Sequence, residues 1–318
     1  MVKDNAEIIK QMLGDKTLAV FAGDDTSFNY GRLPFKIPSL DKLTGGGIPR
    51  KRMTIIFGPS GVGKSYLASQ VAKGVQEDCG LVGWIDTEAS WDIAWMERCG
   101  LDTGSIMVTQ PKSGELAFET ARSFMKAGVD LVVLDSMAGL VPDAVNDEDF
   151  GYNPMAWQAR FCNRSIPRLI PHLQGGTAFV LINQVRSSIG PVALGQLVGG
   201  EAQKFFAHSM IQVNRESWIN DPPSSTTRVG FNIKATLRKS KVDSEHFSNV
   251  VVPFKMDGGI DILETFIREA LDKGLLKQTG AWYTWKEERM QGMNGVKAYF
   301  LKNTDQQDIM VQAVMDAS

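Results

Sequence analysis

The sequence predicts an α/β fold in which crossover helices cover a mainly parallel sheet. Short apolar runs alternate with segments of helical periodicity through most of the chain, which is typical of parallel strands joined by helices. A glycine-rich phosphate-binding loop follows the first of these runs and precedes a helical segment. With 318 residues, the chain is longer than one hydrophobic core usually requires, so small additional domains are expected.

The strands are expected where apolar and β-branched residues cluster, and the helices between them. The six strand-like runs are residues 53–57, 81–85, 106–109, 131–134, 178–182 and 210–213. The helical segments cover residues 65–76, 115–127 and 154–173, and Pro167 interrupts the last of these. Together these elements predict an α/β core over residues 34–256.

Two small units are expected outside this core. Residues 1–33 combine an amphipathic segment with a strand-like run, and an element this small must pack on its own core or on another subunit. Residues 257–318 contain a helix-like stretch and an aromatic-rich stretch, which together predict a compact α+β domain.

Composition limits the possible partners and compartments. The net charge is −2 and the isoelectric point about 6.0, so nucleic-acid binding would depend on a local basic patch. Three scattered cysteines lack metal-ligand spacing, as expected in a reducing cytosol. The chain has neither a signal-like N-terminus nor a long apolar run, so a cytoplasmic location with no membrane contact is expected.

The phosphate-binding loop has the pattern G-x-x-x-x-G-K-S. Its residues are Gly58, Pro59, Ser60, Gly61, Val62, Gly63, Lys64 and Ser65. Glycines let the backbone N–H groups curl around phosphate oxygens, and the helix that follows adds its positive end. Lys64 is expected to reach the β- and γ-phosphates, and the Ser65 hydroxyl to ligate Mg²⁺. The alternative, a chance glycine-rich turn, would not require the flanking strand and helix.

Polar residues end three further apolar runs, where they would complete a nucleotide site. Asp135 follows residues 131–134 and is expected to orient Mg²⁺, although an acid is also a common strand terminus. Glu88 follows residues 81–85 and can activate the attacking water, with Asp86 as a competing candidate. Gln184 follows residues 178–182 and can sense the γ-phosphate. The set indicates ATP hydrolysis or transfer.

The order of the motifs GPSGVGKS, WIDTEASWD, VVLDS, LINQVR, GGEAQKFFAHS and TGAWYTW resembles the RecA recombinase family, including its phage relatives. The likeness extends over nearly the whole chain and implies a RecA-like P-loop NTPase core with an N-terminal polymerisation element. Some segments resemble the phage branch and others the cellular branch, so a phage or divergent bacterial origin is expected.

The resemblance also implies roles for individual residues. It selects Glu88 over Asp86 as the catalytic glutamate, beside Lys64 and Gln184, with ATP and Mg²⁺ as cofactors. Asp92 and Trp95 match positions that hold the adenine, and Tyr66 extends the nucleotide-binding segment.

Lys239 and Lys241 match a pair of catalytic lysines that reach the ATP of a neighbouring subunit. The two are spaced to share one strand face. Without the resemblance, the basic run at residues 238–241 would indicate only a solvated edge.

The resemblance places DNA contacts in two loops, residues 143–156 and 186–202. The expected DNA-binding residues are Met155, Arg160, Arg164, Arg168, Arg186, Ser188, Ile189, Gly199 and Gly200. The arginines at 160, 164 and 168 recur every four residues and so form one helical stripe. The first loop departs from the pattern because it carries the acidic run Asp147-Glu148-Asp149, which repels phosphate unless it faces away.

The function expected from the resemblance is a DNA-dependent ATPase that forms a helical filament on single-stranded DNA. The filament would pair that strand with homologous double-stranded DNA for recombination and repair. Mediator and single-strand-binding proteins are further candidate partners. Two alternatives stay open at this point: a RecA-fold hexameric helicase or branch-migration motor, and a ring-forming ATPase independent of nucleic acid.

Overall fold

The computed structural model describes residues 30–143, 154–186, 196–222, 224–241 and 248–316. The elements described below all lie in one compact unit, Arg32–Ser318. The helix and strand predicted within residues 1–33 fall outside the described residues except at their end, so the proposed three-part division stays a prediction.

A single large sheet forms the centre of this unit and has the strand order β12-β11-β10-β9-β3-β7-β6-β4-β5. The strands from β9 to β5 in that order are all parallel. They are β3 (Met53–Gly58), β4 (Val82–Asp86), β5 (Ile106–Thr109), β6 (Leu131–Asp135), β7 (Ala178–Arg186) and β9 (Ser209–Asn220). The predicted α/β fold with its mainly parallel sheet is confirmed.

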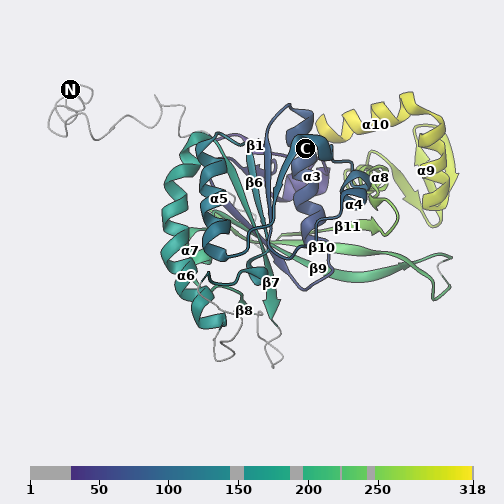
Figure 1. Ribbon diagram of the computed structural model, residues 1–318. Helices are drawn as coiled ribbons and strands as arrows, with labels where there is room; N and C mark the ends of the chain where they lie inside the picture. The colour runs from purple at the N-terminus through teal and green to yellow at the C-terminus, as the bar shows by residue number, and fades with distance from the viewer. Residues whose placement is uncertain (1–29, 144–153, 187–195, 223, 242–247, 317–318) are drawn as a thin grey trace, which may run out of the picture. The chain divides into compact units, whose positions relative to one another are not determined.

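Antiparallel strands extend the sheet at one side. They are β10 (Arg228–Ser240), β11 (Asn249–Lys255) and β12 (Gly259–Ile260), and the short β8 (Gln196–Leu197) pairs with the end of β7. The β9–β10 pair continues well beyond the predicted residues 210–213 and projects from the sheet as a long two-stranded hairpin (Figure 1). A separate small pair is formed by β1 (Arg32–Leu33) and β2 (Ile48–Pro49).

Helices cover both faces of the sheet. On one face lie α2 (Pro38–Leu43), α3 (Lys64–Glu77) and α4 (Ile93–Arg98), and on the other α5 (Gly114–Lys126), α6 (Pro154–Leu169) and α7 (Ala202–Phe206) (Figure 1). Each face has its own apolar core, because strands buried on both sides present Val, Ile and Leu in both directions. Pro167 lies inside α6, which ends two residues later and passes into a 3₁₀ helix, Ile170–Gly175.

A third apolar core belongs to the C-terminal segment. It is enclosed by α8 (Ile262–Asp272), α9 (Gly292–Lys302), α10 (Thr304–Asp316) and a small sheet of β13 (Lys277–Thr279), β14 (Trp282–Trp285) and β15 (Glu288–Gln291). The predicted aromatic stretch supplies part of it, since Tyr283 and Trp285 are buried on one face of β14. This is the expected small α+β unit.

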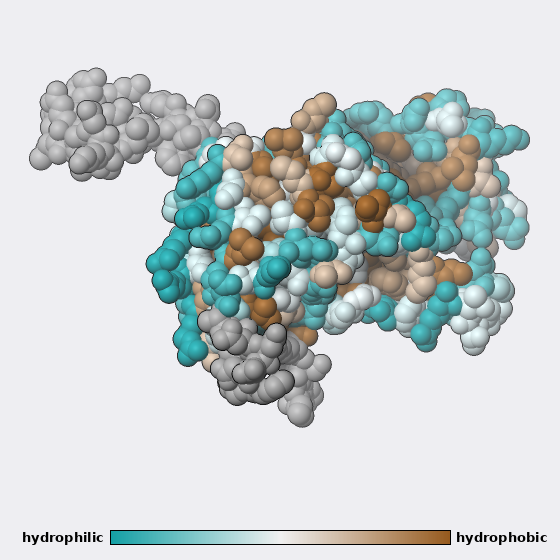
Figure 2. Space-filling view, in the orientation of Figure 1, coloured by the Kyte–Doolittle hydropathy of each residue, from teal (hydrophilic) through white to brown (hydrophobic). Residues whose placement is uncertain are grey.

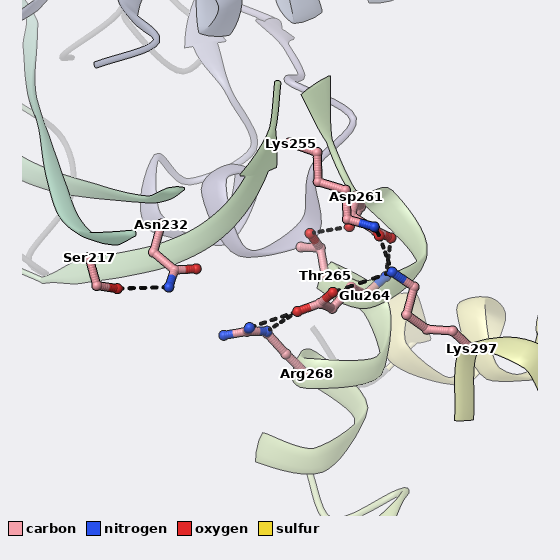
Figure 3. A network of polar contacts seen from close by, with 8 residues as sticks. All are labelled: Ser217, Asn232, Lys255, Asp261, Glu264, Thr265, Arg268 and Lys297. Carbon is pink, nitrogen blue, oxygen red and sulfur yellow. Dashed lines mark hydrogen bonds and ion pairs between the residues drawn. The ribbon is translucent and has the colours of Figure 1, made fainter. Parts of the chain in front are cut away.

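Asp261 joins this C-terminal unit to the central sheet (Figure 3). Its carboxylate caps α8 by accepting from the Glu264 amide at 3.0 Å, and it also pairs with Lys255 of β11 at 3.2 Å and with Lys297 of α9. Burial works to raise the pKa of Asp261, but Lys297, the Glu264 amide and Lys255 hold that pKa below its usual value. The ionised carboxylate therefore stabilises the junction of three elements.

Replacing this carboxylate tests its role. Asp261→Asn should lower the free energy of unfolding by about 1–2 kcal/mol at pH 7, because a helix cap and two ion pairs are weakened. A depressed pKa stabilises the fold at pH values above that of an unfolded aspartate, and this contribution is lost as pH falls through the folded pKa. Urea unfolding should therefore show the difference shrinking below about pH 4. Asp257→Asn, at an exposed turn carboxylate, is the matched control. A difference that persists unchanged in acid would contradict the assignment.

Candidate functional site

The register of the parallel strands brings the predicted nucleotide-site residues to one edge of the sheet. Gly58 at the end of β3 pairs with Gln184 of β7, and Asp86 at the end of β4 pairs with Asp135 of β6. Because parallel strands end at the same edge, the phosphate loop and three polar strand ends lie together.

The phosphate loop occupies the turn between β3 and α3, and its glycines are required by close packing. A Cβ on Gly58 would collide with the carbonyl oxygen of Val213 in β9. Gly63 has a φ of 91°, and a Cβ there would lie 2.8 Å from Ile233 Cδ1 of β10. The loop can therefore follow this path only with glycine at these positions.

Lys64 begins α3, with the positive end of that helix behind it. Its side chain is buried, and its ammonium donates a 2.6 Å hydrogen bond to the carbonyl oxygen of Pro59 across the loop. Burial lowers the pKa of Lys64, while the carboxylates of Asp135 and Glu88 act in the opposite direction. The ammonium is thus held in the loop that would receive phosphates.

Asp135 ends β6 beside this lysine, and the Ser65 hydroxyl lies near enough to its carboxylate to favour the ionised form. Burial, with added repulsion from Glu88 and Asp86, raises the pKa of Asp135 to about 6, against the effects of Ser65 and Lys64. Asp135 thus has two neighbouring carboxylates, Glu88 and Asp86, against one ammonium, and this excess of negative charge is one that a divalent cation would complement.

The residues present fit Mg²⁺ held jointly with a nucleotide. Within the described ranges, no group of three or more His, Cys, Asp or Glu side chains is arranged to enclose a metal ion alone. Mg²⁺ is commonly held by one or two protein oxygens together with phosphate oxygens. Ser65 and Asp135 are adjacent and can supply those protein oxygens.

Glu88 lies in the loop after β4, where two neighbours orient its carboxylate. Its Oε1 accepts from Gln184 Nε2 at 2.9 Å and from the Ser136 hydroxyl. The predicted base and the predicted γ-phosphate sensor are therefore in direct contact. Ser136, which the sequence reading missed, follows Asp135 directly, and its own position is fixed by hydrogen bonds to Thr87.

Asp86, the competing candidate for the general base, uses its carboxylate to hold the loop that carries Glu88. Its two oxygens accept from the Glu88 amide at 3.2 Å, the Trp91 amide at 2.9 Å and Gln110 Nε2 at 2.9 Å. The side chain is only 2% exposed. Its geometry is that of an organising carboxylate, and Gln110 is a further residue that local sequence patterns did not reveal.

The positions expected to hold the base of the nucleotide lie near α4. Asp92 caps this helix, accepting from the Trp95 amide at 2.6 Å. Trp95 is half-buried against the core, with its ring centroid 6.4 Å from that of Phe254 and the Arg98 guanidinium 5.3 Å away. Asp92 therefore has a structural role as a helix cap, and Trp95 has one in packing against the core.

Tyr66 lies in the first turn of α3, but its ring points into the core. Its hydroxyl accepts from the Ile260 amide at 2.8 Å, and its ring meets that of Phe254 edge-on. Burial raises the pKa of Tyr66 to about 12. Any nucleotide contact at this position would therefore use the backbone.

Lys239 and Lys241 lie far from the phosphate loop of their own chain. Lys239 Nζ donates to the carbonyl oxygen of Lys204, in the middle of α7, at 2.5 Å. Ile233 packs against Gly63 of the phosphate loop. Lys239 lies six positions after Ile233 in β10, which at extended spacing separates these two residues by about 20 Å. Burial lowers the pKa of Lys239, and the neighbouring Lys241 lowers it further.

In the described part of the second predicted DNA loop, a glycine turn packs on α6. Gly199 and Gly200 have φ of 93° and 72°, and a Cβ on Gly199 would lie 2.8 Å from Cys162 Sγ. The buried amide of Gln203 holds this turn by donating to the carbonyls of Val198 and Gly200, at 2.5 and 3.0 Å. It also accepts from Asn183 of β7 at 2.6 Å, which links the turn to the strand that carries Gln184.

The three arginines of the α6 stripe are exposed, and the side of the molecule where α6 lies is largely hydrophilic (Figure 2). Arg160 follows Ala159, the residue against which Gly200 packs. Arg164 and Arg168 instead line a groove of about 260 Å³ between α5 and α6, together with Glu115 and Glu119. The stripe thus divides into one arginine beside the glycine turn and two in a mixed-charge groove.

Several predicted DNA-binding residues lie outside the described residues or at the ends of described segments. Ser188 and Ile189 are outside the described residues, as is the acidic run at 147–149. Met155 is in the first turn of α6 and Arg186 ends β7, but only their backbone positions are described.

Comparison with known proteins identifies relatives across nearly the whole chain. The family model of the RecA N-terminal domain matches residues 2–261. The protein named Protein RecA of Frankia casuarinae is 31% identical over 307 residues, covering 94% of this chain and 87% of that protein. The corresponding protein of Mycolicibacterium smegmatis is 32% identical over 290 residues, covering 89% and 82%. Both relatives are bacterial, so of the expected phage or divergent bacterial origin, the phage alternative is not borne out.

The helices of the described ranges are all too short or too polar to cross a lipid bilayer.

Removing the Tyr66 hydroxyl tests whether that group stabilises the fold or binds nucleotide. Tyr66→Phe should lower the free energy of unfolding by about 1 kcal/mol, since the buried Ile260 amide loses its acceptor. Nucleotide affinity should stay unchanged, because the hydroxyl points away from the phosphate loop. Thermal unfolding and calorimetric titration with ADP measure the two quantities. Weaker nucleotide binding with unaltered stability would contradict this placement.

Proposed function

The chain belongs to the RecA family, and from that premise we propose that it is a DNA-dependent ATPase that forms a filament on single-stranded DNA and catalyses strand exchange. The observation that carries the proposal is the contact of Glu88 with Gln184 at the edge where Lys64, Ser65 and Asp135 also meet. Relatives bear the name Protein RecA, which supports a role in recombination and repair.

The residues of the chain divide the work of hydrolysis among them. Lys64 and the amides at the start of α3 bind the β- and γ-phosphates, while Ser65 and Asp135 hold Mg²⁺. When bound, Mg²⁺ neutralises charge that develops on the phosphates. Glu88, oriented by Ser136 and Gln184, accepts a proton from the attacking water.

Gln184 would connect this chemistry with DNA. Its side chain contacts Glu88, the proposed general base. Its strand, β7, leads into the second predicted DNA loop, and the Asn183 side chain of that strand donates a hydrogen bond to Gln203. A γ-phosphate that draws Gln184 away from Glu88 would shift the strand end that supports the loop. This arrangement supports ATP-dependent DNA affinity.

The position of Lys239 and Lys241 supports a site completed by polymerisation. Because they lie at the end of β10 remote from their own Gly63, they can serve ATP chemistry only from an adjacent subunit. An ammonium pair delivered there would offset transition-state charge, as an arginine finger does in other phosphoryl-transfer sites. The protein would then act in the cytoplasm as a helical homo-oligomer on DNA.

Glu88→Gln tests the assignment of the base. The variant should retain ATP-dependent binding to single-stranded DNA, because an amide keeps the shape of the side chain. Turnover should fall by about 100-fold or more, the usual contribution of a general base. Phosphate release with and without DNA measures the loss, and Glu97→Gln, an exposed acid of α4, is the control. Near-normal turnover would remove Glu88 from the mechanism.

Lys64→Ala tests the phosphate site itself. Loss of the buried ammonium should weaken ATP binding by roughly 100-fold and abolish strand exchange, since a charge-assisted contact to phosphate is removed. Strand exchange between homologous circular single-stranded and linear duplex DNA is the measurement. Full exchange by this variant would overturn the proposed function.

A further inference from the structure

Arg215 of β9 connects the projecting hairpin to the phosphate loop. Its Nη2 donates a 3.0 Å hydrogen bond to the carbonyl oxygen of Gly61, although the two residues are 154 positions apart. Gly61 is exposed and has a φ of 67°. Because glycine has wide backbone freedom, this hydrogen bond restricts the peptide plane that follows Gly61.

Two aromatic rings hold the Arg215 guanidinium in place. It lies 4.1 Å from the ring centroid of Trp218 and 5.0 Å from that of Phe231, and these two residues are paired across β9 and β10. Arg228 lies 4.2 Å from the same Trp218 ring. Stacking on aromatic faces orients an arginine whose side chain is otherwise exposed.

The hydrogen bond has a definite consequence for the loop. In a trans peptide the C=O of one residue and the N–H of the next point in opposite directions. Holding the Gly61 carbonyl toward Arg215 therefore directs the Val62 N–H to the other side of the chain. Inward-facing amides of this kind are what a phosphate loop uses to bind its ligand.

The base of the same hairpin also abuts the loop. Val213 of β9 lies against Gly58, and Ile233 of β10 lies against Gly63. Arg215 adds a side-chain hydrogen bond between the backbone contact at Gly58 and the apolar contact at Gly63, so the hairpin supports the loop at its beginning, middle and end.

We propose that Arg215 is a positioning residue of the phosphate loop, and that its stack with Trp218 and Phe231 makes nucleotide affinity depend on the state of the hairpin. The proposal rests on the proposed function, because it assumes that the loop binds ATP. Arg215 acts through the loop backbone and not on the reacting phosphate.

Nucleotide affinity without DNA is the direct test. Calorimetric titration of Mg²⁺–ADP into the full chain should give a dissociation constant about three- to ten-fold higher for Arg215→Ala, as expected for one partly exposed hydrogen bond to a charged donor. Arg215→Lys should also bind more weakly, because an ammonium lacks the planar group that stacks on Trp218.

Steady-state kinetics separates positioning from a general structural defect. Lost positioning in the ground state should raise KM for ATP several-fold and leave kcat at saturating ATP unchanged. A folding defect would instead lower kcat in proportion to the active fraction. Trp218→Phe keeps an aromatic face and should remain near wild type, whereas Trp218→Ala should reproduce part of the Arg215→Ala effect.

Lys234→Ala is the matched control, since Lys234 lies on the same hairpin in an exposed ion pair with Glu216. If Arg215→Ala and Lys234→Ala bind Mg²⁺–ADP with equal affinity while the wild-type chain binds it tightly, the positioning role of Arg215 is overturned and the proposed function is not. A wild-type chain that binds no nucleotide would overturn the proposed function and this inference with it. If Arg215→Ala unfolds at a lower temperature than the wild-type chain, the affinities and kinetics of Arg215→Lys and Trp218→Ala test the positioning role instead.

Discussion

The parallel register of β3, β7, β6 and β4 is the constraint on which the candidate site depends. It places the phosphate loop opposite Gln184 and sets Asp86 beside Asp135. A shift of one residue between any two of these strands would turn their terminal side chains to the other face. Helices pack on both faces of these strands, so the two cores that stabilise the sheet also hold the candidate catalytic groups in line.

The antiparallel extension of the sheet has a different consequence. Since β10 runs back from the phosphate loop, residues near its start support that loop, while Lys239 near its end lies at a distance. One strand thus contributes to the nucleotide site of its own chain through Ile233 and, under the proposed function, to that of a neighbour through its lysines. The hairpin is the element through which assembly and ATP binding would be coupled.

The sequence predicted the buried strands and the loop well because their signals are local. Residues 106–109 form β5 with the predicted bounds, and Lys64 and Asp135 adjoin as expected. It missed the length of β9 because residues 214–217, which follow Val213, are polar and interrupt the apolar run. Long-range contacts leave no local pattern either. The hydrogen bonds of Gln110 to Asp86 and of Arg215 to Gly61 depend on the tertiary arrangement alone.

Electron microscopy of the full chain with single-stranded DNA and a non-hydrolysable ATP analogue tests the central claim most directly. A site shared between subunits, with lysines that cannot reach the ATP of their own chain, predicts continuous helical filaments that require both DNA and nucleotide. Closed rings, or assemblies that form equally well without DNA, would contradict the account.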